Sequence, residues 1–263
     1  MTIQQVGQET SHPSRKPVSR RHFGRMMGTS ALGLGVVACA PDVEQASTST
    51  GEEAAQTGPI VPTQNQTSQE ALTPDGALGL LREGNRRFVS GSPAQRDLSA
   101  QVAATASGQY PFAVILGCID SRVPVEVVFD QGVGDVFAAR VAGNVVNPDL
   151  LGSMEFACRL AGANLVLVLG HTSCGAVKGA ISQAELGNLT GLVKRIEPAV
   201  QAVEGERSVD DEAYVDQVAE TNVSLVLEEI RAKSAVLAEM EQAGEISIVG
   251  AMYDVATGAV RFL

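Results

Sequence analysis

The chain has 263 residues, of which 44% are hydrophobic, and a formal net charge of −11. This length and composition allow one domain with a sizeable core plus extensions. The first 39 residues hold five basic residues and one acidic residue, which leaves 14 basic against 29 acidic residues in the rest of the chain. Such an acidic domain argues against a nucleic-acid partner.

The N-terminal 40 residues resemble an export leader. A basic segment, residues 19–25 (SRRHFGR), precedes an apolar stretch at residues 26–38 that is too short to span a bilayer. The pattern is similar to a twin-arginine signal. We therefore predict a signal over residues 1–40 and export to the periplasm, or anchoring on the outer side of the cytoplasmic membrane.

Two processing routes fit the end of this leader. Residues 36–39 (VVAC) resemble a bacterial lipoprotein box, which predicts a lipid anchor at Cys39. Residues 38–40 (ACA) also satisfy the small-x-small rule of ordinary signal cleavage. We favour lipidation, because cleavage after Ala40 would leave Pro41 at the first mature position, where proline is usually disfavoured.

A linker and one folded domain are predicted to follow. Residues 41–70 are rich in Ser, Thr, Gln, Glu and Pro and hold few large apolar groups, which predicts a disordered linker. Thr73 and Pro74 suit the N-cap and first position of a helix that ends before residues 90–93 (SGSP). The predicted domain therefore covers residues 71–263.

Strand and helix patterns alternate through this domain. Two apolar runs, residues 112–117 (FAVILG) and 165–170 (LVLVLG), are typical of short buried strands. Further elements are predicted as a helix at 124–129, a buried strand at 135–141, helices at 154–161 and 175–182, a mostly helical stretch at 189–242, a strand at 246–252 and a hairpin at 253–262. The order predicts an α/β fold, a mainly parallel sheet flanked by helices with a C-terminal antiparallel edge strand.

A candidate metal site follows the two apolar runs. Cys118 comes directly after the first run, and His171 and Cys174 follow the second. The carboxyl ends of parallel strands meet at one edge of a sheet, so these three side chains are expected to converge. Two thiolates and an imidazole are ligands that Zn²⁺ prefers, and three protein ligands leave the fourth position of a catalytic site for water. A water bound to zinc becomes acidic enough to supply hydroxide near neutral pH.

The remaining cysteine and histidine residues restrict the chemistry further. The four cysteines, Cys39, Cys118, Cys158 and Cys174, do not form a disulfide framework pattern, and Cys158 is expected to be a small buried hydrophobe. His171 is the only histidine after the leader. If it binds the metal, no histidine remains to shuttle protons, and proton release must depend on buffer or on carboxylates and water.

Asp120 and Arg122 stand beside the first ligand. An aspartate next to a guanidinium has a lowered pKa and a fixed orientation. Asp120 is therefore expected either to orient a zinc-bound water or, with Arg122 turned away, to become the fourth ligand and close the site.

These motifs resemble those of the β-class carbonic anhydrases: Cys-x-Asp-x-Arg at 118–122 and Gly-His-x-x-Cys-Gly at 170–175. The resemblance covers about residues 73–263, including residues 84–88 (GNRRF), 140–144 (RVAGN) and 250–254 (GAMYD). It implies one zinc per subunit and the reversible hydration of carbon dioxide to bicarbonate.

The resemblance also implies roles for three pocket residues and an assembly. Gln109 would donate to a substrate oxygen across a subunit interface, and Phe137 and Phe156 match pocket positions, although core packing explains either Phe equally well. A homodimer or higher homo-oligomer is implied. The chain contains no tryptophan, so the Trp-Arg-Tyr cluster through which some members bind regulatory bicarbonate is not expected.

Two alternative functions stay open at this point. One is a hydrolase of CS2 or carbonyl sulfide on the same scaffold, because zinc-bound hydroxide attacks other linear molecules of suitable size. The other is a non-catalytic zinc protein that binds bicarbonate, with Asp120 as a permanent fourth ligand.

Overall fold

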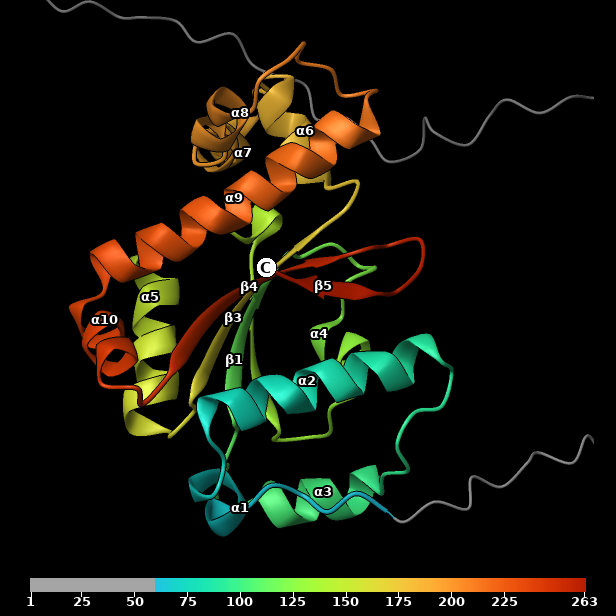
Figure 1. Ribbon diagram of the computed structural model, residues 1–263, viewed down its shortest axis with the longest axis vertical. Coiled ribbons are helices and arrows are strands. Elements are labelled where there is room, and N and C mark those ends of the chain that lie inside the picture. Colours follow the sequence, from blue (N-terminus) through green and yellow to red (C-terminus); the bar gives the residue numbers. More distant parts are fainter. Residues whose placement is uncertain (1–59) are drawn as a thin grey trace, which may run out of the picture. The chain divides into compact units, whose positions relative to one another are not determined.

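A five-stranded sheet forms the centre of the computed structural model, which describes residues 60–263 (Figure 1). The strand order is β2-β1-β3-β4-β5, and only β5 runs antiparallel to its neighbour. The α/β architecture with a C-terminal antiparallel edge strand is therefore confirmed. The strands are β1 (Ala113–Gly117), β2 (Val136–Arg140), β3 (Leu165–His171), β4 (Ser247–Tyr253) and β5 (Val260–Phe262).

Helices cover both faces of this sheet. None of the helices in the described residues is long and apolar enough to cross a membrane. They are α1 (Gln66–Glu70), α2 (Pro74–Val89), α3 (Leu98–Thr105), α4 (Val125–Val128), α5 (Pro148–Glu155), α6 (Gly175–Ile181), α7 (Gly187–Val193), α8 (Glu197–Ala202), α9 (Glu212–Lys233) and α10 (Ala235–Gln242), with a 3₁₀ turn η2 (Ala142–Asn144) and a π-helical turn η3 (Phe156–Leu160).

The two faces of the sheet contribute to two separate hydrophobic cores. Alternate side chains of a strand point to opposite faces. In β1, Val114 and Leu116 pack on the face covered by α5, α9 and α10, whereas Ala113 and Ile115 pack on the face covered by α2 and α4 (Figure 1). Both β1 and β3 are therefore buried along their whole length, as their unbroken apolar runs predict.

The N-terminal boundary of the domain differs from the prediction. Helix α1 lies within residues 41–70, the segment predicted as a disordered linker, so the prediction is wrong for residues 66–70. Asn65 caps α1, and the buried Gln69 side chain donates hydrogen bonds to the carbonyls of Pro111 and Ala161 at 2.7 and 2.8 Å. These contacts come from residues distant in the sequence, so local composition does not reveal them. The predicted leader and residues 41–59 lie outside the described residues.

Two further elements differ from the sequence-based expectation. Strand β2 is half-buried instead of buried, because it is an edge strand and pairs only with β1. Helix α3 was not expected at all; Asp97 caps it, and only Gln101 of its residues is buried. A helix that buries so few side chains has only a weak apolar periodicity, and its sequence pattern therefore does not predict it.

Candidate metal centre

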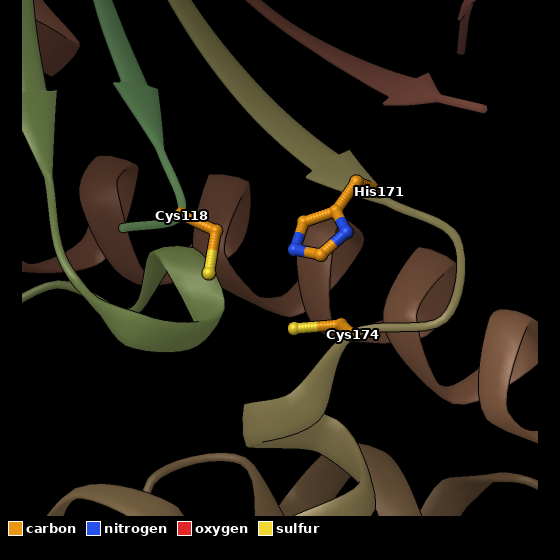
Figure 2. A group of neighbouring side chains, drawn as sticks. All are labelled: Cys118, His171 and Cys174. Carbon is orange, nitrogen blue, oxygen red and sulfur yellow. The ribbon is translucent and has the colours of Figure 1, made fainter. Parts of the chain in front are cut away.

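Cys118, His171 and Cys174 come together at the carboxyl end of the sheet. Cys118 follows β1, His171 is the last residue of β3, and Cys174 precedes α6. Because β1 and β3 are parallel neighbours, both ligand-bearing loops leave the same edge. The two sulfur atoms and a ring nitrogen lie within 4.8 Å of one another, and all three side chains are buried. Figure 2 shows them pointing toward one common space.

The hydrogen bonding of His171 leaves one ring nitrogen available to a metal. Nδ1 lies 2.9 Å from the carbonyl of Thr172, and as the donor of this bond it places the lone pair on Nε2. Nε2 is buried and has no hydrogen-bond partner. A buried, unpaired imidazole nitrogen beside two sulfurs is the donor set that suits Zn²⁺, so the residues fit the metal that the sequence predicts.

The environment of the two sulfurs favours a thiolate. A hydrogen bond from the Cys174 thiol is the main factor that lowers the pKa of Cys118, and the same bond together with burial raises the pKa of Cys174. The backbone N–H of Gly143 also donates to Cys118 Sγ at 3.3 Å. A metal bound to both sulfurs would displace the proton that Cys174 keeps.

Asp120 and Arg122 form a bidentate pair beside this site. Arg122 donates to Asp120 from Nε at 2.9 Å, from Nη2 at 2.8 Å and from its backbone N–H at 2.9 Å. These bonds hold the pKa of Asp120 well below its usual range. Arg122 Nη2 also donates to the carbonyl of Ser173 at 3.3 Å, which joins the pair to the loop between His171 and Cys174. The carboxylate is thus ionised and fixed in one orientation.

Two residues that support the ligand loops had no role assigned from the sequence. Arg140, at the end of β2, donates from Nε to the carbonyl of Cys118 at 2.8 Å and from Nη2 to the carbonyl of Asp120 at 2.6 Å. Asp216, on α9, accepts the backbone N–H of Ser173 at 2.8 Å. Arg140 stands in the motif at 140–144, which was a usable signal, whereas Asp216 lies in a long helix without any local motif.

The three predicted pocket residues lie before β1, on β2 and at the start of η3, and their role in a pocket stays a prediction. Gln109 is exposed and precedes β1, so the length of that strand, about 16 Å for five residues, separates it from Cys118. Phe137 on β2 and Phe156 at the start of η3 contact each other edge to face, with ring centroids 6.2 Å apart. Phe156 is 49% exposed, which an ordinary core residue would not be.

Cys158 is buried in η3, and burial raises its pKa to about 12. It does not belong to the metal-ligand group. Its expected place as a small core hydrophobe is confirmed.

Comparison with known proteins identifies a family that matches this arrangement. Residues 113–260 match the family model described as carbonic anhydrase. The chain is 40% identical over 191 residues to carbonic anhydrase 2 of Mycobacterium tuberculosis, an alignment that covers 70% of this chain and 90% of the relative.

Solved structures show the same fold. A β-carbonic anhydrase of Aspergillus fumigatus, CafA, superposes with a TM-score of 0.55 and 29% identity over 72% of this chain and 89% of that one. One of two tetrameric β-carbonic anhydrases of Sordaria macrospora superposes with a TM-score of 0.54 and 21% identity over 63% of this chain and 90% of that one.

Proposed function

The chain belongs to the β-class carbonic anhydrases and is an enzyme of that activity, and on this premise we propose that Cys118, His171 and Cys174 hold a catalytic Zn²⁺ for CO2 hydration. The convergence of their three ligand atoms within 4.8 Å carries the proposal. When bound, Zn²⁺ supplies a Lewis acid that makes a coordinated water acidic near neutral pH.

Asp120 orients the attacking water in this mechanism. Its carboxylate is ionised, and Arg122 donates a hydrogen bond to each of its oxygens. Asp120 can therefore accept a hydrogen bond from the water without becoming protonated. Accepting that bond directs a lone pair of the water oxygen toward the carbon of CO2. The reaction joins this oxygen to the carbon and releases one proton, and bicarbonate leaves.

The hydrogen bonds from Arg122 also bear on whether Asp120 would be the fourth ligand of the metal. They favour a site in which Asp120 does not bind the metal. Ligation by Asp120 requires a carboxylate oxygen to exchange its bond to Arg122 for one to the metal. Three hydrogen bonds from Arg122 oppose that exchange. We propose that Asp120 stays bound to Arg122 and would leave the fourth position of a metal held by Cys118, His171 and Cys174 to water.

The decisive experiment measures CO2 hydration and zinc content together in the wild type and in Asp120→Ala. We expect one zinc per chain in both proteins, activity in the wild type, and a loss of activity in the variant. A wild type that holds zinc but does not hydrate CO2 at any pH overturns the proposal. In that case, assays with carbonyl sulfide and CS2, and a bicarbonate-binding measurement, would identify the alternative function.

We further propose that the enzyme works as a homo-oligomer in which Gln109 completes the site of a partner subunit. The Sordaria macrospora neighbours are tetrameric. The distance from Gln109 to its own metal ligands and the exposed ring of Phe156 support an interface role. Sedimentation should report a dimer or larger species, and Gln109→Ala should lower activity without loss of zinc. A fully active monomer contradicts this assembly.

Export is the last part of the proposal. The twin-arginine motif at residues 19–25 and Cys39 support translocation and lipid attachment. Fractionation of cells that express the whole chain should find it outside the cytoplasm, and a change of both Arg20 and Arg21 to Lys should retain it inside. Cys39→Ala should release the protein from the membrane fraction. A Cys39→Ala variant that stays in the membrane fraction, or a wild type that is never found there, contradicts the lipid anchor.

A further inference from the structure

A strained turn next to the metal ligands aims one backbone N–H at Cys118. In η2, Gly143 has φ +68° and Asn144 has φ +42°, both in the left-handed region. This conformation places the Gly143 N–H 3.3 Å from Cys118 Sγ. A β-carbon at Gly143 would lie 2.5 Å from Ile196 Cδ1, so the Ile196 side chain packs closely against the turn.

A buried side chain of α9 hydrogen-bonds this turn. Asn222, on α9, is 2% exposed, and its Nδ2 donates to the carbonyl of Gly143 at 2.9 Å. The two residues are 79 positions apart in the sequence. Because that carbonyl belongs to the peptide between Gly143 and Asn144, the bond fixes the peptide plane on which the left-handed pair depends.

The hydrogen bond to sulfur affects a metal that the sulfur binds. An N–H donor stabilises the ionised thiolate, the form that binds a metal, over the neutral thiol and fixes the orientation of the sulfur. Partners of this kind typically change metal affinity 10- to 100-fold when they are removed. We propose that Asn222 is a positioning residue for the metal centre, which raises zinc affinity by holding Gly143 N–H on Cys118; this inference rests on the zinc site of the proposed function.

The surroundings of Asn222 set it apart from an ordinary core residue. The buried residues of α9 are otherwise mostly apolar, among them Val218, Val223 and Val226. A buried amide in such a core lowers stability unless it is hydrogen-bonded, and an apolar side chain would fill the same space without that condition. Its donor is directed at the turn whose Gly143 N–H contacts Cys118.

The test compares Asn222→Ala with Val226→Ala. Val226 is buried on the same face of α9, one turn further along the chain, and its truncation removes packing but no hydrogen bond to η2. Zinc affinity is measured by competition with a chromogenic chelator. The thiolate-to-cobalt absorption band of the Co²⁺-substituted proteins is measured in parallel.

We expect Asn222→Ala to bind zinc 10- to 100-fold more weakly and to show a shifted thiolate band. Val226→Ala should stay within threefold of the wild type and keep its band. Equal zinc affinity in Asn222→Ala and the wild type overturns the inference, and so does an equal loss in both variants, because that result reflects stability alone.

Asn222→Leu provides a second variant if Asn222→Ala does not fold. It keeps most of the side-chain volume but has no donor, so the same loss of zinc affinity is expected. A wild type that binds no zinc would refute the metal site of the proposed function. Normal zinc binding in the wild type together with an unaffected Asn222→Leu refutes only the role of Asn222.

Discussion

Replacing Arg122 with alanine tests whether the orientation of Asp120 limits catalysis. The change removes the bonds from Nε and Nη2 to the carboxylate and leaves only the backbone N–H donor. Hydrogen bonds to charged groups contribute about 1.5–3 kcal/mol each. The Arg122 side chain is 48% exposed, so the lower value applies to both bonds.

Two such bonds stabilise the productive orientation by about 3 kcal/mol, which corresponds to roughly a 100-fold change. We therefore expect kcat/KM for CO2 hydration to fall about 100-fold in Arg122→Ala, measured by stopped flow with a pH indicator. Arg159→Ala is the matched control, because that surface arginine pairs with Glu245 at 3.5 Å and contacts no ligand loop. Arg122→Ala that keeps full zinc and more than a third of wild-type kcat/KM would refute the reasoning.

Three further predictions concern pH, protons and packing. The pKa of Asp120 is lowered mainly by Arg122, so its contribution to stability is full above the unfolded-state pKa of about 4 and is lost only as the pH falls further. The difference in unfolding free energy between the wild type and Asp120→Asn should be constant from about pH 5 to 8, and a difference that shrinks over this range is contrary to expectation. Turnover should rise with buffer concentration, because His171 is the only histidine in the described residues and is a proposed ligand; turnover independent of buffer would show an internal proton route. Gly84→Ala places a β-carbon 1.8 Å from the carbonyl oxygen of Phe129, so urea unfolding should show a loss of at least about 4 kcal/mol, and a loss below about 1 kcal/mol would mean that α2 moves easily.

The residues of the proposed metal site were predictable because the signal for each of them is local. Cys118 and His171 each mark the end of an apolar run, and parallel strands bring such ends together without any knowledge of the loops between them. Asp120 and Arg122 are two residues apart, so their pairing is also a short-range property.

The supporting residues were not predictable in the same way. Asn222 contacts a turn 79 positions earlier, and Asp216 contacts a residue 43 positions earlier. Nothing in the periodicity of α9 distinguishes these two from its other polar positions. The buried position of Gln69 in α1 was not predicted for the same reason, because its hydrogen-bond partners lie in distant loops.

The sequence by itself determined which groups are available for chemistry: the donor atoms of the proposed zinc site, the carboxylate and guanidinium beside them, and the buried strands that carry them. These features depend on residue type and on short spacings, and both can be read directly from the sequence. Only the tertiary structure decided that β2 is an edge strand, that Gln109 lies a strand length away from the proposed metal site of its own chain, and that α9 supports both the loop between His171 and Cys174 and the turn η2. Such features arise from packing between distant segments, where the free energy of a contact depends on which surfaces meet and not on the local order of residues.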